Sequence, residues 1–374
     1  MTNNTEKSCL WAFVSNIETD QYVYAYFIVC GVLTILINFV VFYVAIRYID
    51  LRAKPNQIFV VSMTMSDLLF GLVFMVSRPF VGCFPKWLCG PYYLASWGCQ
   101  MGSSLFLLLL NIDKFIAIRF PLHYNRMITE RVVFSQALYT WILISLVASF
   151  HFYGGYLQYQ FPDSCFIRFE PALYYHLYTL LAYITPLMVS FMISVYIFII
   201  AQLASSTQQS AHAPTRRMVM KRILFVFSST MWTSFTSLPY RIAYGLYSAC
   251  ASVAPTQLSA HTNFTAFNFT TTSAPCTVLF LSAYNTYGHR TDACASATTQ
   301  LLIDCLFYMM VLGAVGNPIV TIVTQRIYRT PVLSIWGKLA RRLHLPQCGR
   351  AVRRADTLDT SLQAPESIRL FEVI

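Results

Sequence analysis

Four charged residues stand inside otherwise apolar stretches of this 374-residue sequence: Asp67, Arg78, Arg241 and Asp304. A charge in such surroundings is costly unless it is paired or faces a water-filled cavity, so each is a candidate for ligand or ion binding. Enzyme chemistry is not indicated, because the sequence contains no H-E-x-x-H, G-x-S-x-G or G-x-G-x-x-G motif. We therefore predict a binding protein that is not an enzyme and that has no cofactor and no catalytic metal site.

The two arginines allow two interpretations. In the first, Arg78 and Arg241 hold an anionic group, such as the carboxylate of a peptide or a lipid, between aromatic walls that include Tyr244. In the second, an arginine forms a structural ion pair with Asp304, and the tyrosines form an interfacial aromatic belt. The residues alone leave both interpretations open.

The elements that must position these residues are membrane-spanning helices. Hydrophobic residues make up 56% of the chain and charged residues 11%, whereas soluble domains carry about 25% charged residues. A spanning helix needs about 20 mostly apolar residues, and continuous apolar runs favour helices over the alternating strands of a β-barrel. The sequence thus predicts an all-α, seven-transmembrane helix bundle with spans at residues 22–46, 56–80, 89–118, 131–153, 173–203, 217–247 and 298–325.

The basic residues orient this bundle. Most of the 26 lysines and arginines fall in the connections after spans 1, 3 and 5 and in the C-terminal tail. The positive-inside rule then places the N-terminus outside and the tail in the cytoplasm. The net charge of +11 is explained by anionic membrane lipid and a cytoplasmic partner, without nucleic acid. Three glycosylation acceptors agree with this topology, because all lie on the outer side: Asn3, Asn263 and Asn268.

The same reasoning divides the chain into three parts. We expect residues 1–21 to be an extracellular segment and residues 22–325 to form the bundle, with a long extracellular loop over residues 249–297. Residues 326–374 form a cytoplasmic tail. The tail opens with an amphipathic stretch at about 328–343, which is typical of a short eighth helix on the membrane surface.

Several motifs occur in order along the spans. Span 3 closes with D-K-F-I-A-I-R-F-P-L-H-Y at residues 113–124, and span 7 contains Gly316-Asn317-Pro318. The other spans and the start of span 3 carry single markers: Asn38, Asp67, Cys89, Trp141, Pro186 and Pro239. Together these residues resemble the rhodopsin-like (class A) G-protein-coupled receptors, whose DRYxAIxxPLxY block appears here with two substitutions.

The resemblance implies functions for several residues. In the family, the carboxylate that matches Asp67 helps to hold a sodium ion, with polar partners that match Ser103 and Asn317, and Asn38 belongs to the same predicted polar core. The alternative for Asp67 is a carboxylate hydrogen-bonded to Asn38 and buried water. The family's disulfide corresponds to Cys89 and Cys165. Its switch for G-protein engagement matches Asp113, Lys114, Phe115, Pro239, Asn317 and Pro318.

The resemblance also limits the classes of ligand that the protein is expected to bind. Amine receptors have an aspartate where this chain has Ser96, and opsins need a lysine in span 7, where this chain has none. Amine and retinal ligands are therefore disfavoured, and we expect a peptide or another carboxylate-bearing molecule. Ser96 joins Arg78, Arg241, Tyr244 and Asp304 as an expected ligand-binding residue.

Four switch positions depart from the family pattern: Lys114, Ser194, Ser237 and Thr321. Lysine keeps the charge of the usual arginine but lacks its planar fork. The sequence predicts a multi-pass plasma-membrane receptor that activates a heterotrimeric G-protein and, through hydroxyls of its tail, meets arrestin. The alternatives are a receptor-like protein that binds ligand without signalling, and a transporter, although no internal repeat is evident.

Overall fold

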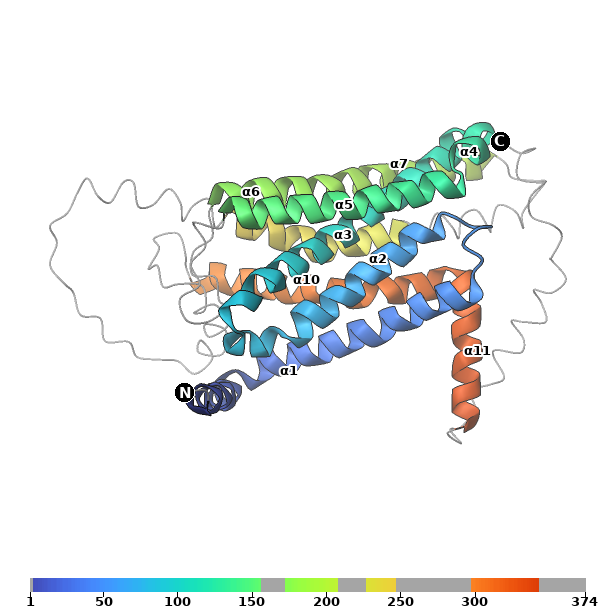
Figure 1. Ribbon diagram of the computed structural model, residues 1–374. Helices are drawn as coiled ribbons and strands as arrows, with labels where there is room; N and C mark the ends of the chain where they lie inside the picture. The colour runs from blue at the N-terminus through green and yellow to red at the C-terminus, as the bar shows by residue number, and fades with distance from the viewer. Residues whose placement is uncertain (1–2, 156–171, 208–226, 247–296, 343–374) are drawn as a thin grey trace, which may run out of the picture.

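Long helices lie side by side along one common axis, as the ribbon in Figure 1 shows for α1, α3, α5 and α10. This arrangement is seen in a computed structural model that describes residues 3–155, 172–207, 227–246 and 297–342. Within those ranges the secondary structure is helical and contains no strand. The all-α prediction is therefore confirmed for the described part of the chain.

Six helical segments of the described ranges are long and apolar enough to cross a membrane. They correspond to six of the seven predicted spans and comprise Tyr22–Tyr48, Gln57–Val76, Trp87–Arg119, Glu130–Tyr153, His176–Ile200 and Leu301–Thr324. The predicted sixth span is described as a helix over residues 227–246. The helices that contain the first, third, fourth and seventh spans are α1 (Asn3–Tyr48), α3 (Lys86–Arg119), α5 (Glu130–Gly155) and α10 (Ala297–Thr324).

Two spans change their helical pitch near prolines. In span 2, α2 (Gln57–Phe70) continues as the π-helix η1 (Gly71–Val76), and the 3₁₀ helix η2 (Arg78–Cys83) follows with Pro79 near its start. In span 5, the π-helix η3 (Leu180–Ile184) lies between α6 (Ala172–Thr179) and α7 (Thr185–Thr207), whose second residue is Pro186. Proline lacks the backbone donor of a regular helix, and a π segment absorbs the mismatch locally.

The helix ends differ from the predicted boundaries. Helix α1 begins at Asn3, so the backbone of the segment predicted as a separate N-terminal part continues the helix of span 1. Helix α11 (Arg326–Arg342) covers the predicted eighth helix and, in Figure 1, runs across the bundle axis at one end. Buried Tyr328 anchors it, because its hydroxyl donates to Gln57 Oε1 at 3.1 Å. Its position on a membrane surface stays a prediction.

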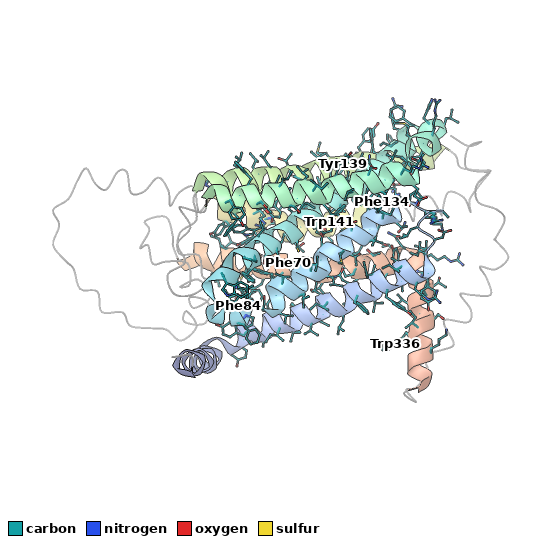
Figure 2. All side chains as sticks on the ribbon, viewed as in Figure 1. Phe70, Phe84, Phe134, Tyr139, Trp141 and Trp336 are labelled. Atoms are coloured by element: carbon teal, nitrogen blue, oxygen red, sulfur yellow. The ribbon has the colours of Figure 1, made fainter. Side chains whose placement is uncertain are left out.

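Apolar side chains point both into the bundle and away from it. On α5, Trp141 packs against Phe106 of α3 with ring centroids 5.4 Å apart, whereas Phe134 and Tyr139 are exposed, as Figure 2 shows. Outward-facing apolar side chains are expected in a membrane protein. Lipid tails are as apolar as the bundle interior, so an apolar side chain is equally stable facing either one. The polar residues of the interior are therefore the informative ones.

Candidate functional site

A cavity of about 50 Å³ lies inside the bundle and has room for a few water molecules. The helix at residues 227–246 lines it with Thr233, Ser237 and Arg241, which are four residues apart and so share one helix face. The other described lining residues come from α2, α3, η3 and α10: Asp67, Phe70, Gln100, Ser103, Ser104, Tyr183, Met310, Gly313, Ala314 and Asn317.

The inner end of the cavity holds a chain of polar contacts that we call the mid-membrane network (Asp67, Thr233 and Asn317). Asn317 Nδ2 donates to Asp67 Oδ2 at 3.2 Å, and Thr233 Oγ1 donates to Asn317 Oδ1 at 2.9 Å. Ser103 on α3 lines the same cavity as Asp67 and Asn317. The network therefore connects α2, α10 and the helix at 227–246, and Asp67, Ser103 and Asn317 lie around one cavity.

Asn38 takes a different position from the predicted one. Its Nδ2 donates to the Thr34 carbonyl at 2.9 Å and to the Ala314 carbonyl at 3.4 Å, and it makes no hydrogen bond to Asp67. Pro318 has no backbone N–H to offer the Ala314 carbonyl four residues before it. Asn38 thus supplies the donor that the proline lacks, so the predicted Asn38–Asp67 hydrogen bond is wrong and Asn38 joins α1 to α10 instead.

The outer part of the cavity is shaped around Arg241. Its guanidinium hydrogen-bonds Gln100 Oε1 of α3 and lies over the Tyr183 ring, with the Arg241 Cζ atom 3.9 Å from the ring centroid. The Tyr183 hydroxyl donates to the Trp97 carbonyl at 3.0 Å, which fixes the ring. Arg241 is only 8% exposed. A guanidinium offers a planar set of N–H donors that matches the geometry of a carboxylate.

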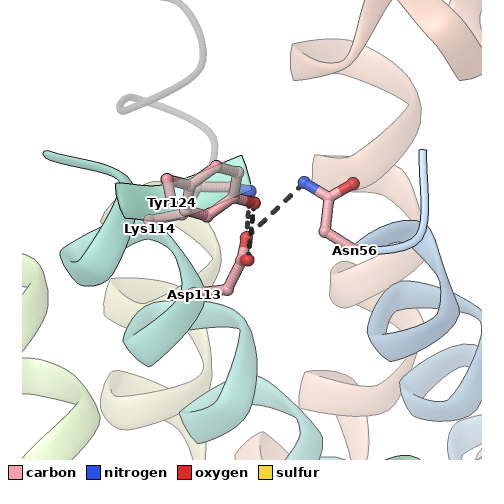
Figure 3. Close-up of polar contacts among 4 residues, drawn as sticks. All are labelled: Asn56, Asp113, Lys114 and Tyr124. Atoms are coloured by element: carbon pink, nitrogen blue, oxygen red, sulfur yellow. Dashed lines mark hydrogen bonds and ion pairs between the residues drawn. The ribbon is translucent and has the colours of Figure 1, made fainter. Parts of the chain in front are cut away.

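A second polar group lies at the opposite end of α3, and we call it the cytoplasmic cluster (Asn56, Asp113, Lys114 and Tyr124). Lys114 Nζ lies 2.5 Å from Asp113 Oδ2, and the Tyr124 hydroxyl donates to Asp113 Oδ1 at 2.8 Å, as Figure 3 shows. Asn56 Nδ2 adds a longer contact of 3.5 Å. Burial, reinforced by the Asp113 carboxylate, raises the pKa of Tyr124, so its hydroxyl stays a donor.

Comparison with known proteins identifies the family. The model of the 7 transmembrane receptor (rhodopsin family) matches residues 37–320. The chain belongs to this family. It is also similar to the G-protein coupled receptor aex-2 of Caenorhabditis elegans, with 32% identity over 333 residues that cover 87% of each chain. Shorter matches, at 30% identity, are the D(1B) dopamine receptor of Mus musculus (32% of this chain, 27% of that one) and the GQ-coupled rhodopsin of Mizuhopecten yessoensis (37% and 30%).

The receptor separates the charges that were predicted to act together. Arg241 lines the cavity, whereas Arg78 begins η2, lies over the Phe74 ring at 5.8 Å and is not among the residues that line it. Asp304 of α10 is buried, and in the described part of the chain no ion pair joins it to either arginine. The structural Arg–Asp304 ion pair is therefore wrong, because the helix packing directs the three side chains to different places.

Ser96 and Tyr244 also lie outside the cavity lining. The Ser96 hydroxyl donates to the Tyr92 carbonyl of its own helix at 2.6 Å and is buried there. Tyr244 lies against Tyr240, with ring centroids 5.8 Å apart. Sequence reasoning missed Gln100 and Tyr183, which contact Arg241. The available signal was their polarity within otherwise apolar spans.

The remaining residues predicted to form the switch are distributed along the bundle. The Phe115 ring packs 5.7 Å from the Tyr196 ring of α7, and Pro239 lies within the helix at 227–246. Of the substituted positions, Ser194 is buried, Ser237 lines the cavity, and Thr321 Oγ1 donates to the Asn317 carbonyl at 3.0 Å. Thr321 therefore hydrogen-bonds the backbone of Asn317, whose side chain donates to Asp67.

Trp232 forms a contact that sequence reasoning did not find. Its Nε1 donates to the Gly313 carbonyl at 3.1 Å, and the indole lies against Gly316, where an added Cβ atom would overlap it. An added Cβ atom at Gly313 would likewise come within 2.7 Å of Thr236 Oγ1. The two glycines, three residues apart on α10, are the small-residue signal that marks a close approach of two membrane helices.

Several predicted sites fall outside the described residues. Cys89 is buried at the start of α3, but Cys165, its predicted partner, is not among them, so the disulfide stays a prediction. The same holds for Asn263, Asn268 and the loop at 249–297. Asn3 is the first residue of α1, and its glycosylation is untested.

Proposed function

We propose that this receptor lies in the plasma membrane, binds an extracellular ligand through a carboxylate, and activates a heterotrimeric G-protein. The carrying observation is Arg241, a buried guanidinium that lines the cavity between Gln100 and the Tyr183 ring. A carboxylate can accept two parallel hydrogen bonds from such a fork, which gives both binding energy and orientation. The aromatic face would then cover the non-polar part beside the acid.

The environment of Ser96 argues against an amine ligand. Its hydroxyl is engaged with the Tyr92 carbonyl, and the described cavity lining places its one carboxylate, Asp67, at the inner end. A retinal Schiff base would need a lysine on α10, and the sequence of that helix contains none. Similarity to dopamine receptors and to a rhodopsin over about a third of the chain therefore does not extend to their ligands in this proposal.

The ligand proposal is tested with a tissue extract that stimulates the receptor in cells. Arg241→Ala should abolish the response at normal surface expression, Arg241→Lys should weaken it, and Arg78→Ala should leave it near the wild-type level. Methyl esterification of the extract should also remove the activity, because it neutralises carboxylates. A full response of Arg241→Ala, or an esterified extract of undiminished potency, would rule out the carboxylate-binding function.

The G-protein proposal rests on the cytoplasmic cluster. Lys114 forms the ion pair with Asp113 that the family forms with arginine, so the charge needed at this position is present and held at 2.5 Å. We expect Lys114→Ala to abolish G-protein activation and Lys114→Arg to retain it. Arrestin would act afterwards on the tail hydroxyls, which lie outside the described residues.

A second candidate function is ligand binding without signalling, favoured by the substitutions at Lys114, Ser194, Ser237 and Thr321. This function would be supported if three proteins bind an extract fraction at the cell surface but none activates a G-protein: the wild type, Lys114→Arg and Lys114→Ala. Activation by the wild type that Lys114→Ala removes would exclude it.

A further inference from the structure

The start of α2 contacts two other elements through two consecutive side chains. Asn56 is the N-cap residue of α2, and Gln57 is its first residue. Asn56 Nδ2 donates to Asp113 Oδ2 of α3 at 3.5 Å, and Gln57 Oε1 accepts a hydrogen bond from the Tyr328 hydroxyl of α11 at 3.1 Å. The start of α2 therefore joins the cytoplasmic cluster to the first turn of α11.

Tyr328 is fixed in its place by the packing around it. The residue is 0% exposed and belongs to the same hydrophobic cluster as Phe59 and Val60 of α2. Its backbone N–H donates at 3.1 Å to the carbonyl of Gln325, the residue between α10 and α11. Because the ring is packed on all sides, a displacement of α11 carries the hydroxyl with it and acts directly on Gln57.

The ion pair in the cytoplasmic cluster determines whether the Lys114 ammonium is available to a partner. Lys114 Nζ lies 2.5 Å from Asp113 Oδ2, and the Lys114 side chain is 21% exposed. A cytoplasmic protein that uses this charge must first separate the pair, which is a strong charge-assisted contact. Tyr124 and Asn56 both donate to the Asp113 carboxylate and hold it where it meets Lys114. Both donors therefore favour the paired arrangement, which we call the resting arrangement.

We propose that Gln57 and Tyr328 are positioning residues that hold the start of α2 in the resting arrangement. Through Asn56, the start of α2 in turn holds Asp113 in its ion pair with Lys114. The effect on signalling rests on the proposed activation of a G-protein. When the hydrogen bond between Tyr328 and Gln57 is lost, the start of α2 is released and the ion pair separates more readily. One typical hydrogen bond corresponds to a roughly fivefold shift between the two populations.

The first measurement is basal G-protein activation in cells, without ligand and at matched surface expression. Tyr328→Phe removes the hydroxyl and keeps the buried ring, and it should raise basal activation roughly fivefold. Gln57→Met removes the acceptor at similar length and should have the same effect. Because both changes remove one hydrogen bond, the double variant should equal either single variant instead of multiplying their effects. Tyr48→Phe, at an exposed tyrosine that ends α1, is the matched control and should keep the wild-type value.

The second measurement is amide hydrogen exchange of the purified receptor, followed by mass spectrometry and made without a G-protein. Tyr328→Phe should speed exchange roughly fivefold in α11 and also in residues 113–127, which include the end of α3 and α4 (Pro121–Met127). A residue that only anchored α11 would change exchange in α11 alone. Tyr48→Phe should leave both regions at the wild-type rate. If Tyr328→Phe does not fold, Gln57→Met, at a less buried position, provides the same comparison.

The proposal is overturned if exchange in Tyr328→Phe rises in α11 alone, or if basal activation stays equal or falls while the wild type responds to extract. Equal changes in Tyr48→Phe, or multiplied effects in the double variant, would overturn it as well. Its failure is distinguishable from that of the proposed function. Faster exchange in both regions of a receptor that activates no G-protein would overturn the signalling function and support the contact between α11 and the cytoplasmic cluster through α2.

Discussion

The mid-membrane network and the cytoplasmic cluster both surround a buried aspartate, yet they join the chain over very different distances. Asn317 reaches Asp67 across 250 positions of sequence, and Thr233 reaches Asn317 across 84. In the cytoplasmic cluster, Tyr124 follows Asp113 by 11 positions, and Lys114 is its direct neighbour. The first group therefore holds separate spans together, whereas the second mainly organises the end of one helix and the loop behind it.

The difference in exposure follows the same division. The Asp113 side chain is 1% exposed, but its partner Lys114 is 21% exposed and so retains contact with water. The mid-membrane network is buried within the bundle, where an unsatisfied polar group is costly. Equivalent substitutions should therefore lower the free energy of unfolding more in the mid-membrane network than in the cytoplasmic cluster. Substitutions in the cytoplasmic cluster should affect G-protein activation more than stability.

The largest loss of stability is expected from a side chain added at Gly316, where α10 packs closely against Trp232. Gly316→Ala would place a Cβ atom inside the Trp232 indole, so the indole or the two helices must shift, and the Trp232–Gly313 hydrogen bond would be strained. Overpacking should cost about 3 kcal/mol, more than the roughly 1 kcal/mol that alanine gains in helix propensity. Thermal unfolding of purified receptor measures this. Gly337→Ala, with nothing within 4 Å of the added Cβ atom, is the control; equal behaviour of the two variants would contradict the prediction.

The next largest loss of stability is expected at Asn317, and Asn56 provides the comparison, because each asparagine donates to a buried aspartate. Asn317→Ala removes a 3.2 Å contact to buried Asp67 and the acceptor of Thr233, and should cost about 2 kcal/mol of unfolding free energy. Asn56→Ala removes only a 3.5 Å contact to Asp113 and should cost less than about 1 kcal/mol. Chemical denaturation of both variants measures the difference. A costlier Asn56→Ala would reverse the comparison between the two regions.

A smaller and pH-dependent effect is expected in the cytoplasmic cluster. Tyr124→Phe removes the hydroxyl that donates to Asp113 and should cost about 1 kcal/mol near pH 7. The pKa of Tyr124 is raised in the folded state, so the stability it contributes is complete below the ordinary tyrosine value of about 10 and is lost as the pH rises further. The difference in melting temperature between wild type and variant should stay constant to about pH 9 and shrink above pH 10. A difference that changes between pH 7 and pH 9 would refute this assignment.

The smallest effect concerns a hydrogen bond between spans 3 and 6. Asn111 Nδ2 donates to Thr230 Oγ1 at 3.0 Å, while also donating to the Leu107 carbonyl of its own helix. Thr230→Val should cost about 0.6 kcal/mol, the average for such bonds between membrane helices. Thr140→Val is matched to it, because the Thr140 hydroxyl contacts only the Gln136 carbonyl in its own helix at 2.7 Å and should cost almost nothing. Equal melting temperatures of the two variants would show that the bond between helices adds no stability.

Much of the candidate site could be derived from the sequence. The apolar lengths predicted the spans, and the resemblance to the rhodopsin-like receptors implied that Asp67, Ser103 and Asn317 lie together and that Asp113 pairs with Lys114. The span predictions succeed because span length is set by the thickness of the membrane, whereas the grouping of residues from different spans came from the shared fold of the family.

Which side chains face the interior was decided only by the tertiary structure. Both the lipid and the bundle interior accept apolar residues, so the spans carry little of the one-sided periodicity that reveals an inner face in soluble helices. For that reason the sequence could not show that Arg241 lines the cavity while Arg78 does not, that Asp304 remains apart from both, or that Trp232 lies against Gly316. These placements depend on the rotation and close approach of packed helices, which no single span determines.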